Sequence, residues 1–69
     1  MKLAIPTTKM DESGNITCIE YHDTDGNHII DSIWDENEEQ TTENRKAFKK
    51  WSDEFVTHNK GYEVQLSGF

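Results

Sequence analysis

Carboxylates are the most frequent chemically active side chains in this 69-residue chain, and most lie in one stretch. Eleven of the fourteen occur between Asp11 and Asn44, where no lysine or arginine interrupts them. They are Asp11, Glu12, Glu20, Asp23, Asp25, Asp31, Asp35, Glu36, Glu38, Glu39 and Glu43. The remaining residues carry all seven cations and three carboxylates, so the net charge of −7 is strongly polarised along the chain. Nucleic acids and anionic membranes bind through lysine and arginine, so we exclude them as direct ligands and expect a basic partner.

Paired carboxylates can act as general acid and base, but so many acids guarantee some neighbouring pair, and the pairing alone indicates nothing. The chain has no glycine-rich phosphate loop and no Gly-x-Ser-x-Gly turn. A domain of this size also has little room for a pocket that excludes water. We therefore expect no enzymatic activity and no cofactor.

Residues 23–27, Asp-Thr-Asp-Gly-Asn, alternate oxygen ligands as the start of an EF-hand calcium loop does. His28 then occupies the position that needs glycine, and Trp34 occupies the position that needs a bidentate glutamate. The pattern predicts a solvent-facing turn rather than a calcium site.

Cysteine and histidine could bind a metal or supply a nucleophile. Cys18 and His22 lie four apart in a predicted strand, ~13 Å along it, which is too far for a thiol–imidazole pair. His28 could face His22 across a turn, but no third ligand has the spacing that zinc needs. We expect no metal site, and we expect Cys18 to be a small buried hydrophobe. A single cysteine also excludes an intrachain disulfide and indicates a reducing compartment.

Polar turn segments at residues 11–15 and 23–27 divide the first half of the chain into three segments rich in strand-forming residues. The predicted strands are Lys2–Met10, Ile16–His22 and His28–Trp34. Successive hairpins of this kind form an antiparallel meander. Pro6 lacks an N–H group, so the first strand should lie at a sheet edge, at least on that side.

A helix is predicted near residues 38–60. Asp35 or Asn37 could cap its first turn, and Gly61 supplies a left-handed end. Asp35, Glu39 and Glu43 would then repeat along one helix stripe, a like-charge arrangement that costs stability. Apolar residues with the spacing of one helical face should pack in the core; they are Ala47, Phe48, Trp51 and Phe55.

Tyr62, Val64 and Leu66 alternate with polar residues and predict a last strand. The fold class is therefore α+β, an antiparallel β-meander with one amphipathic helix and a C-terminal strand (β-β-β-α-β), in a single domain over residues 1–69. The sequence has no apolar run of ~18 residues that would span a bilayer, and its first residues become polar too early for a secretory signal. We expect a cytoplasmic protein.

Both faces of the central strands are partly apolar, whereas one helix covers only one face. With a three-residue second turn, one face would carry Ile19, Tyr21, Ile29 and Ile33. The other would carry Ile16, Cys18, Ile30 and Trp34. A two-residue turn would shift the register by one. Leu, Ile, Val and Phe make up only 13 of the 69 residues, so the core is thin and we expect a homodimer.

The whole chain resembles the small acidic proteins with which phages disable host DNA-binding proteins. The resemblance rests on size, charge pattern and cysteine content over all 69 residues. It implies a DNA mimic that inhibits a basic host protein, for example a nucleoid-associated protein of the HU type, in the bacterial cytoplasm. Carboxylates two apart in a strand or four apart in a helix are spaced at ~6–7 Å, similar to successive phosphates. The partner-binding residues would be Asp23, Asp25, Asp31, Asp35, Glu36, Glu38, Glu39 and Glu43.

Two other functions remain open. The protein could be an interaction adaptor that uses an apolar sheet face, with acids that serve only solubility. A small metal-binding or catalytic domain is the third possibility. Trp34, beside the acidic run, could pack in the core or anchor a basic partner.

Overall fold

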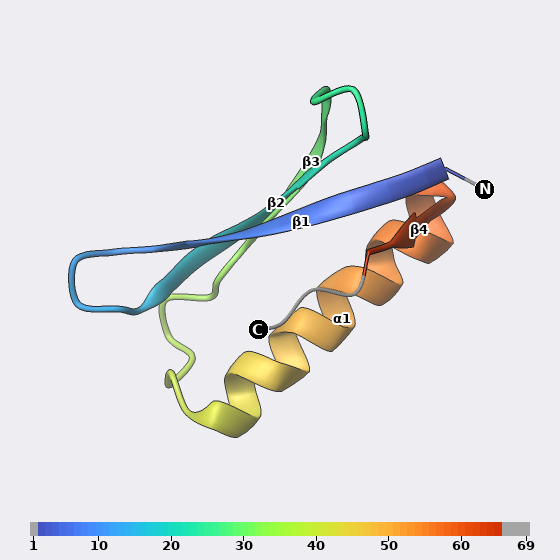
Figure 1. The fold of residues 1–69 in the computed structure, drawn as a ribbon. Coiled ribbons are helices and arrows are strands. Elements are labelled where there is room, and N and C mark those ends of the chain that lie inside the picture. The colour runs from blue at the N-terminus through green and yellow to red at the C-terminus, as the bar shows by residue number, and fades with distance from the viewer. Residues whose placement is uncertain (1, 66–69) are drawn as a thin grey trace.

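A four-stranded mixed sheet packs against one helix (Figure 1). The chain order, β-β-β-α-β, is the one that the sequence predicts. This computed structural model describes residues 2–65. Its elements are β1 (Lys2–Met10), β2 (Ile16–His22), β3 (His28–Ile33), α1 (Thr42–Lys60) and β4 (Tyr62–Val64). The α+β class is confirmed, whereas the expected strand residue Leu66 lies outside the described residues.

The strand order in the sheet is β3-β2-β1-β4. Two antiparallel hairpins join the first three strands, and α1 carries the chain back so that β4 pairs in parallel with β1. The prediction of an edge position for β1 is therefore wrong for its first residues, since Lys2, Leu3 and Ala4 pair with β4. At Pro6, β2 is the only neighbouring strand within residues 2–65, which accommodates the missing N–H.

Both hairpin turns use the same local chemistry, an aspartate at the start and a glycine three residues later. Asp11 Oδ1 accepts hydrogen bonds from two later backbone N–H groups, and Asp23 Oδ1 does the same in the second turn. Gly14 and Gly26 adopt φ of 83° and 85°, where glycine is favoured because it has no Cβ. The predicted turns are confirmed, including the segment that resembles a calcium loop.

The helix begins later than the sequence predicts. Thr41 is its N-cap and accepts a hydrogen bond from the backbone N–H of Asn44 at 3.0 Å. Asp35 is not the cap because its Oδ1 accepts from the N–H of Asn37 in a separate turn. The expected like-charge helix stripe is therefore wrong: of its members, only Glu43 lies in α1. The predicted end at Gly61 is confirmed, with φ of 74°.

The register of the central hairpin also differs from the expectation. Ile30 lies opposite Tyr21, and Ile33 lies opposite Cys18, so these two isoleucines have exchanged the predicted faces. The cause is a bulge beside Tyr21, which shifts the pairing by one residue at Ile29. Both Ile29 and Ile30 pack against the core. That core consists of the buried residues Ala4, Ile19, Tyr21 and Val56.

The helix faces the sheet through a different stripe from the predicted one. Ser52 and Val56 are fully buried, whereas Ala47 is exposed and 56% of Trp51 is exposed. The buried stripe is displaced by one residue position, which corresponds to a rotation of α1 by about 100° about its own axis. Phe48 packs against the core in both arrangements. Among residues 2–65, no helix is long and apolar enough to cross a membrane.

The sheet face away from α1 is partly apolar. Leu3, Ile5 and Cys18 are half-buried on this face, and Ile33 is 69% exposed. Strand alternation places them opposite to Ala4 and the other core residues. We refer to this surface as the open sheet face; it is where the predicted homodimer would form.

Candidate functional site: an acidic end with an aromatic groove

Three separate segments meet at one end of the molecule, namely the turn at residues 11–15, the loop at 34–41 and the first turn of α1 (Figure 1). The side-chain amide of Gln40 joins the first two. It donates to the carbonyl of Ile16 at 2.9 Å and accepts from the N–H of Ile16 at 3.2 Å. Arg45 Nη2 donates to the carbonyl of Gly14 at 3.2 Å and ties the turn to the helix. The end is therefore a built structure rather than three independent loops.

We define the acidic end by the seven exposed carboxylates of these segments: Asp11, Glu12, Asp35, Glu36, Glu38, Glu39 and Glu43. Arg45 is the single lysine or arginine within the same segments, and Lys9 and Lys46 lie just outside them. Because all seven acids face solvent, their negative potential is available to a partner and is screened by salt.

The structure brings together five of the eight predicted partner-binding residues. Asp35, Glu36, Glu38, Glu39 and Glu43 belong to the acidic end.

The other three lie elsewhere. Asp23 and Asp25 line a hollow with Lys2, at the end of the sheet where β2 finishes rather than where it begins. Asp31 lies on β3, and its carboxylate contacts His28 Nε2 at 2.8 Å. The continuous acidic line that the sequence suggested does not form.

Two of the predicted binding carboxylates, Asp23 and Asp35, accept hydrogen bonds from backbone N–H groups of their own turns. The N–H of Asn27 donates to Asp23 and lowers the pKa of that carboxyl below its ordinary value. Asp35 Oδ1 accepts from Asn37 N at 2.9 Å. By contrast, five side chains of the acidic end make no hydrogen bond or ion pair within residues 2–65; they are Glu12, Glu36, Glu38, Glu39 and Glu43. Within the acidic end, those five are the carboxylates most available to a partner.

A groove of about 400 Å³ lies beside the acidic end, between the end of β3 and the start of α1. Its apolar lining consists of Ile33, Trp34, Ala47, Phe48 and Trp51. Its polar lining consists of Asp35, Glu38 and Asn44. We call this site the aromatic groove.

The aromatic rings of the groove are held in place by one another and by the loop. Trp34 is 8% exposed, and its Nε1–H donates to the carbonyl of Glu38 at 3.1 Å. Phe48 meets Trp34 edge-to-face with centroids 4.9 Å apart, and its ring stacks at 26° to Trp51, 6.3 Å away. Sequence spacing placed Trp51 in the core; the rotation of α1 instead leaves its ring on the surface.

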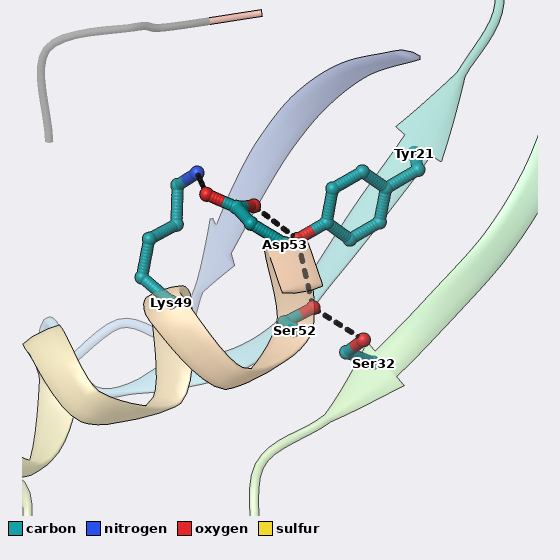
Figure 2. A network of polar contacts seen from close by, with 5 residues as sticks. All are labelled: Tyr21, Ser32, Lys49, Ser52 and Asp53. Carbon is teal, nitrogen blue, oxygen red and sulfur yellow. Dashed lines mark hydrogen bonds and ion pairs between the residues drawn. The ribbon is translucent and has the colours of Figure 1, made fainter. Parts of the chain in front are cut away.

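A buried polar network lies between sheet and helix, away from the acidic end (Figure 2). Tyr21 Oη lies 2.7 Å from Ser52 Oγ and 2.6 Å from Asp53 Oδ1, and Ser52 also contacts Ser32. Lys49 Nζ pairs with Asp53 Oδ2 at 2.5 Å. Burial, and then the hydrogen bond to Asp53, raise the pKa of Tyr21 above its ordinary value, so the phenol stays protonated.

Tyr21, Ser32 and Ser52 of this network are buried. Its role is to dock α1 onto the sheet. Sequence reasoning missed it because Ser52 is polar and interrupts the apolar helix pattern. The one available signal was the i, i+4 spacing of Lys49 and Asp53, and this pair is half-buried in the structure.

Histidine and cysteine do not assemble a metal site in the described part of the chain. No group of three His, Cys, Asp or Glu side chains there could hold a metal ion. His22 and His28 meet edge-to-face with ring centroids 5.7 Å apart. Cys18 is half-buried on the open sheet face. Comparison of the chain with protein-family models, with curated proteins and with solved structures finds no match in any of the three.

Proposed function

We propose that the protein binds a basic protein through the acidic end, in competition with DNA, and so acts as an inhibitor of a DNA-binding protein. One observation supports this most strongly: seven exposed carboxylates from three segments share one end with Arg45. A like-charge cluster costs stability, and a feature that breaks a local rule in this way tends to mark function. In this proposal the protein works in the cytoplasm of a bacterial host, and its target is a protein such as a nucleoid-associated protein of the HU type.

The acidic end has the physical properties that a substitute for DNA requires. Its loop is fixed by Gln40 and by Trp34, so the backbone that carries the charges is preorganised and binding need not order the loop. Lysines and arginines that normally contact phosphates would find carboxylates instead. Such an interaction weakens steeply with salt and does not depend on the sequence of the competing DNA.

The decisive experiment compares two triple variants of equal net charge. The first, Glu36→Gln/Glu39→Gln/Glu43→Gln, neutralises the acidic end. The control, Asp25→Asn/Glu54→Gln/Glu63→Gln, removes three exposed carboxylates elsewhere. Asp53 is unsuitable as a control because it belongs to the buried network.

Immobilised wild-type protein should retain basic proteins from a bacterial lysate, and added duplex DNA of any sequence should release them. The acidic-end variant should lose this retention, and the control should keep it. If the two variants behave alike, net charge rather than the acidic end is responsible. Retained proteins that resist both salt and DNA would contradict the proposal.

A second candidate is supported by the open sheet face, where Ile33 is 69% exposed. In an adaptor, this apolar face would be the contact surface and the acids would serve solubility. Ile5→Thr would then abolish partner retention, whereas the acidic-end variant would have no effect.

A further inference from the structure

We infer that the aromatic groove binds an arginine side chain of the basic partner, which gives the acidic end a chemical preference beyond charge alone. This inference rests on the proposed function and assigns part of the contact to a defined site. Its basis is the placement of flat aromatic rings and carboxylates around one concave surface, lined by Trp34, Trp51, Asp35 and Glu38.

The groove is preformed. Trp34 is fixed by its hydrogen bond to the Glu38 carbonyl and by its edge-to-face contact with Phe48, so it gives the groove a rigid buried wall. Trp51 is a second wall, stacked on Phe48 and 56% exposed. A large aromatic ring held beside a groove at the surface offers contact area to a partner without an ordering cost.

Charge in the lining selects the class of occupant. A wholly apolar side chain would desolvate the carboxylates of Asp35 and Glu38 without compensation. A cation pairs with them. Asp35 Oδ1 is engaged by Asn37, which leaves its second oxygen without a hydrogen bond within residues 2–65.

Arginine fits this combination better than lysine does. Its guanidinium is planar and weakly hydrated, so it can stack on an indole face while its N–H groups reach carboxylates. The lysine ammonium is a compact, strongly hydrated charge that gains less from the ring. The groove therefore predicts a preference for arginine that a simple acidic surface would not show.

The test measures the binding of two fluorescein-labelled peptides of equal length, one alternating arginine with glycine and the other alternating lysine with glycine. Fluorescence anisotropy should show about fivefold tighter binding of the arginine peptide to the wild-type protein. The indole N–H resonance of Trp51 should shift with the arginine peptide in ¹⁵N–¹H spectra. Equal affinities, or no binding of either peptide, would overturn the inference.

Two sets of variants separate the groove from the acidic end. Trp51→Ala should remove the arginine preference, and Trp51→Phe should retain part of it; circular dichroism verifies that both fold. Asp35→Asn/Glu38→Gln removes the charges of the groove but keeps an oxygen to cap the turn of Asp35. It should weaken the arginine peptide more than the lysine peptide. An arginine preference that survives Trp51→Ala contradicts the inference.

Failure of the inference is distinct from failure of the proposed function. If both peptides bind equally and the acidic-end variant loses basic proteins, the proposed function stands and the groove has no part in it. If the wild-type protein retains no basic protein but shows an arginine preference that depends on Trp51, the groove binds arginine and the competition with DNA is wrong.

Discussion

The hydroxyl group of Tyr21 lies 2.6 Å from Oδ1 of Asp53, and this contact fixes the direction of a whole hydrogen-bond chain. The carboxylate can only accept, so the single phenol hydrogen goes to Asp53. Ser52 must then donate to Tyr21, and Ser32 to Ser52. Every hydroxyl hydrogen in this chain is used, and Lys49 neutralises the charge at its end. The helix therefore has one orientation on the sheet in which these groups are satisfied.

Replacement of Tyr21 by Phe should lower the free energy of unfolding by about 2 kcal/mol, because a buried hydrogen bond to a charged group is lost and Ser52 is left without its acceptor. Urea denaturation followed by circular dichroism measures the effect. Tyr62→Phe is the matched control, since Tyr62 makes no side-chain hydrogen bond within residues 2–65; it should change stability by less than about 0.5 kcal/mol. Equal losses in both variants would show that the network does not stabilise the fold.

Tyr21 should also make the protein sensitive to alkali. Its pKa in the folded state is raised above the ordinary value of 10.0, chiefly by burial. Below pH 10.0 the phenol is protonated in both folded and unfolded states, and its contribution to stability is fully present. Above pH 10.0 the phenol loses its proton in the unfolded chain before it does so in the folded protein, so the free energy of unfolding falls as pH rises. Urea midpoints measured from neutral to alkaline pH should fall more steeply for the wild type than for Tyr21→Phe. Parallel curves would contradict this prediction.

Local sequence was sufficient for the strands and turns of this fold. Aspartate and glycine three residues apart fix both hairpin turns through contacts within five residues. Strand-forming residues between the two turn segments identified β2 with its bounds, Ile16–His22. Gly61 ended the helix as predicted, because a left-handed residue is a local requirement.

Contacts between distant residues decided what the sequence pattern could not. The rotation of α1 follows from the need to give the hydroxyl of Tyr21 a partner, which Ser52 supplies from 31 residues away. The spacing of apolar residues along the helix does not reveal that a polar residue, Ser52, must face the sheet. The acidic run predicted a charged surface, but its division between two ends of the sheet depends on strand direction and on the long-range bond of Gln40 to Ile16.

Gln40→Ala should loosen the acidic end without unfolding the protein. Both backbone groups of Ile16 lose their partner, and the loop at 34–41 is released from the first hairpin. Amide hydrogen exchange at Ile16 should become about tenfold faster. Asn59→Ala is the control, since the Asn59 side chain bonds only to Phe55 within its own helix. Unchanged exchange at Ile16 would show that the loop is fixed by other contacts.

The homodimer stays a prediction, and the open sheet face is where we expect the two copies to meet. Sedimentation at micromolar concentration should give twice the mass of the chain. Ile5→Lys should produce a monomer, because it places a charge at the centre of that face. Glu54→Gln changes the net charge by the same amount on the helix surface and should remain a dimer. A monomeric wild type with well-protected sheet amides would contradict the prediction.

Neutralisation of Glu36 and Glu39 should make the protein slightly more stable while it weakens partner binding. Both carboxylates lie among like charges and form no ion pair within residues 2–65, so Glu36→Gln/Glu39→Gln should raise the free energy of unfolding by about 0.5 kcal/mol at low salt. Glu43→Gln should have the opposite sign, because Glu43 lies in the first turn of α1 and interacts favourably with the helix dipole. Urea denaturation at low and high salt measures both effects, and added salt should remove most of the difference. If the double variant is less stable than the wild type at low salt, these carboxylates hold the loop in place, and their clustering needs no functional explanation.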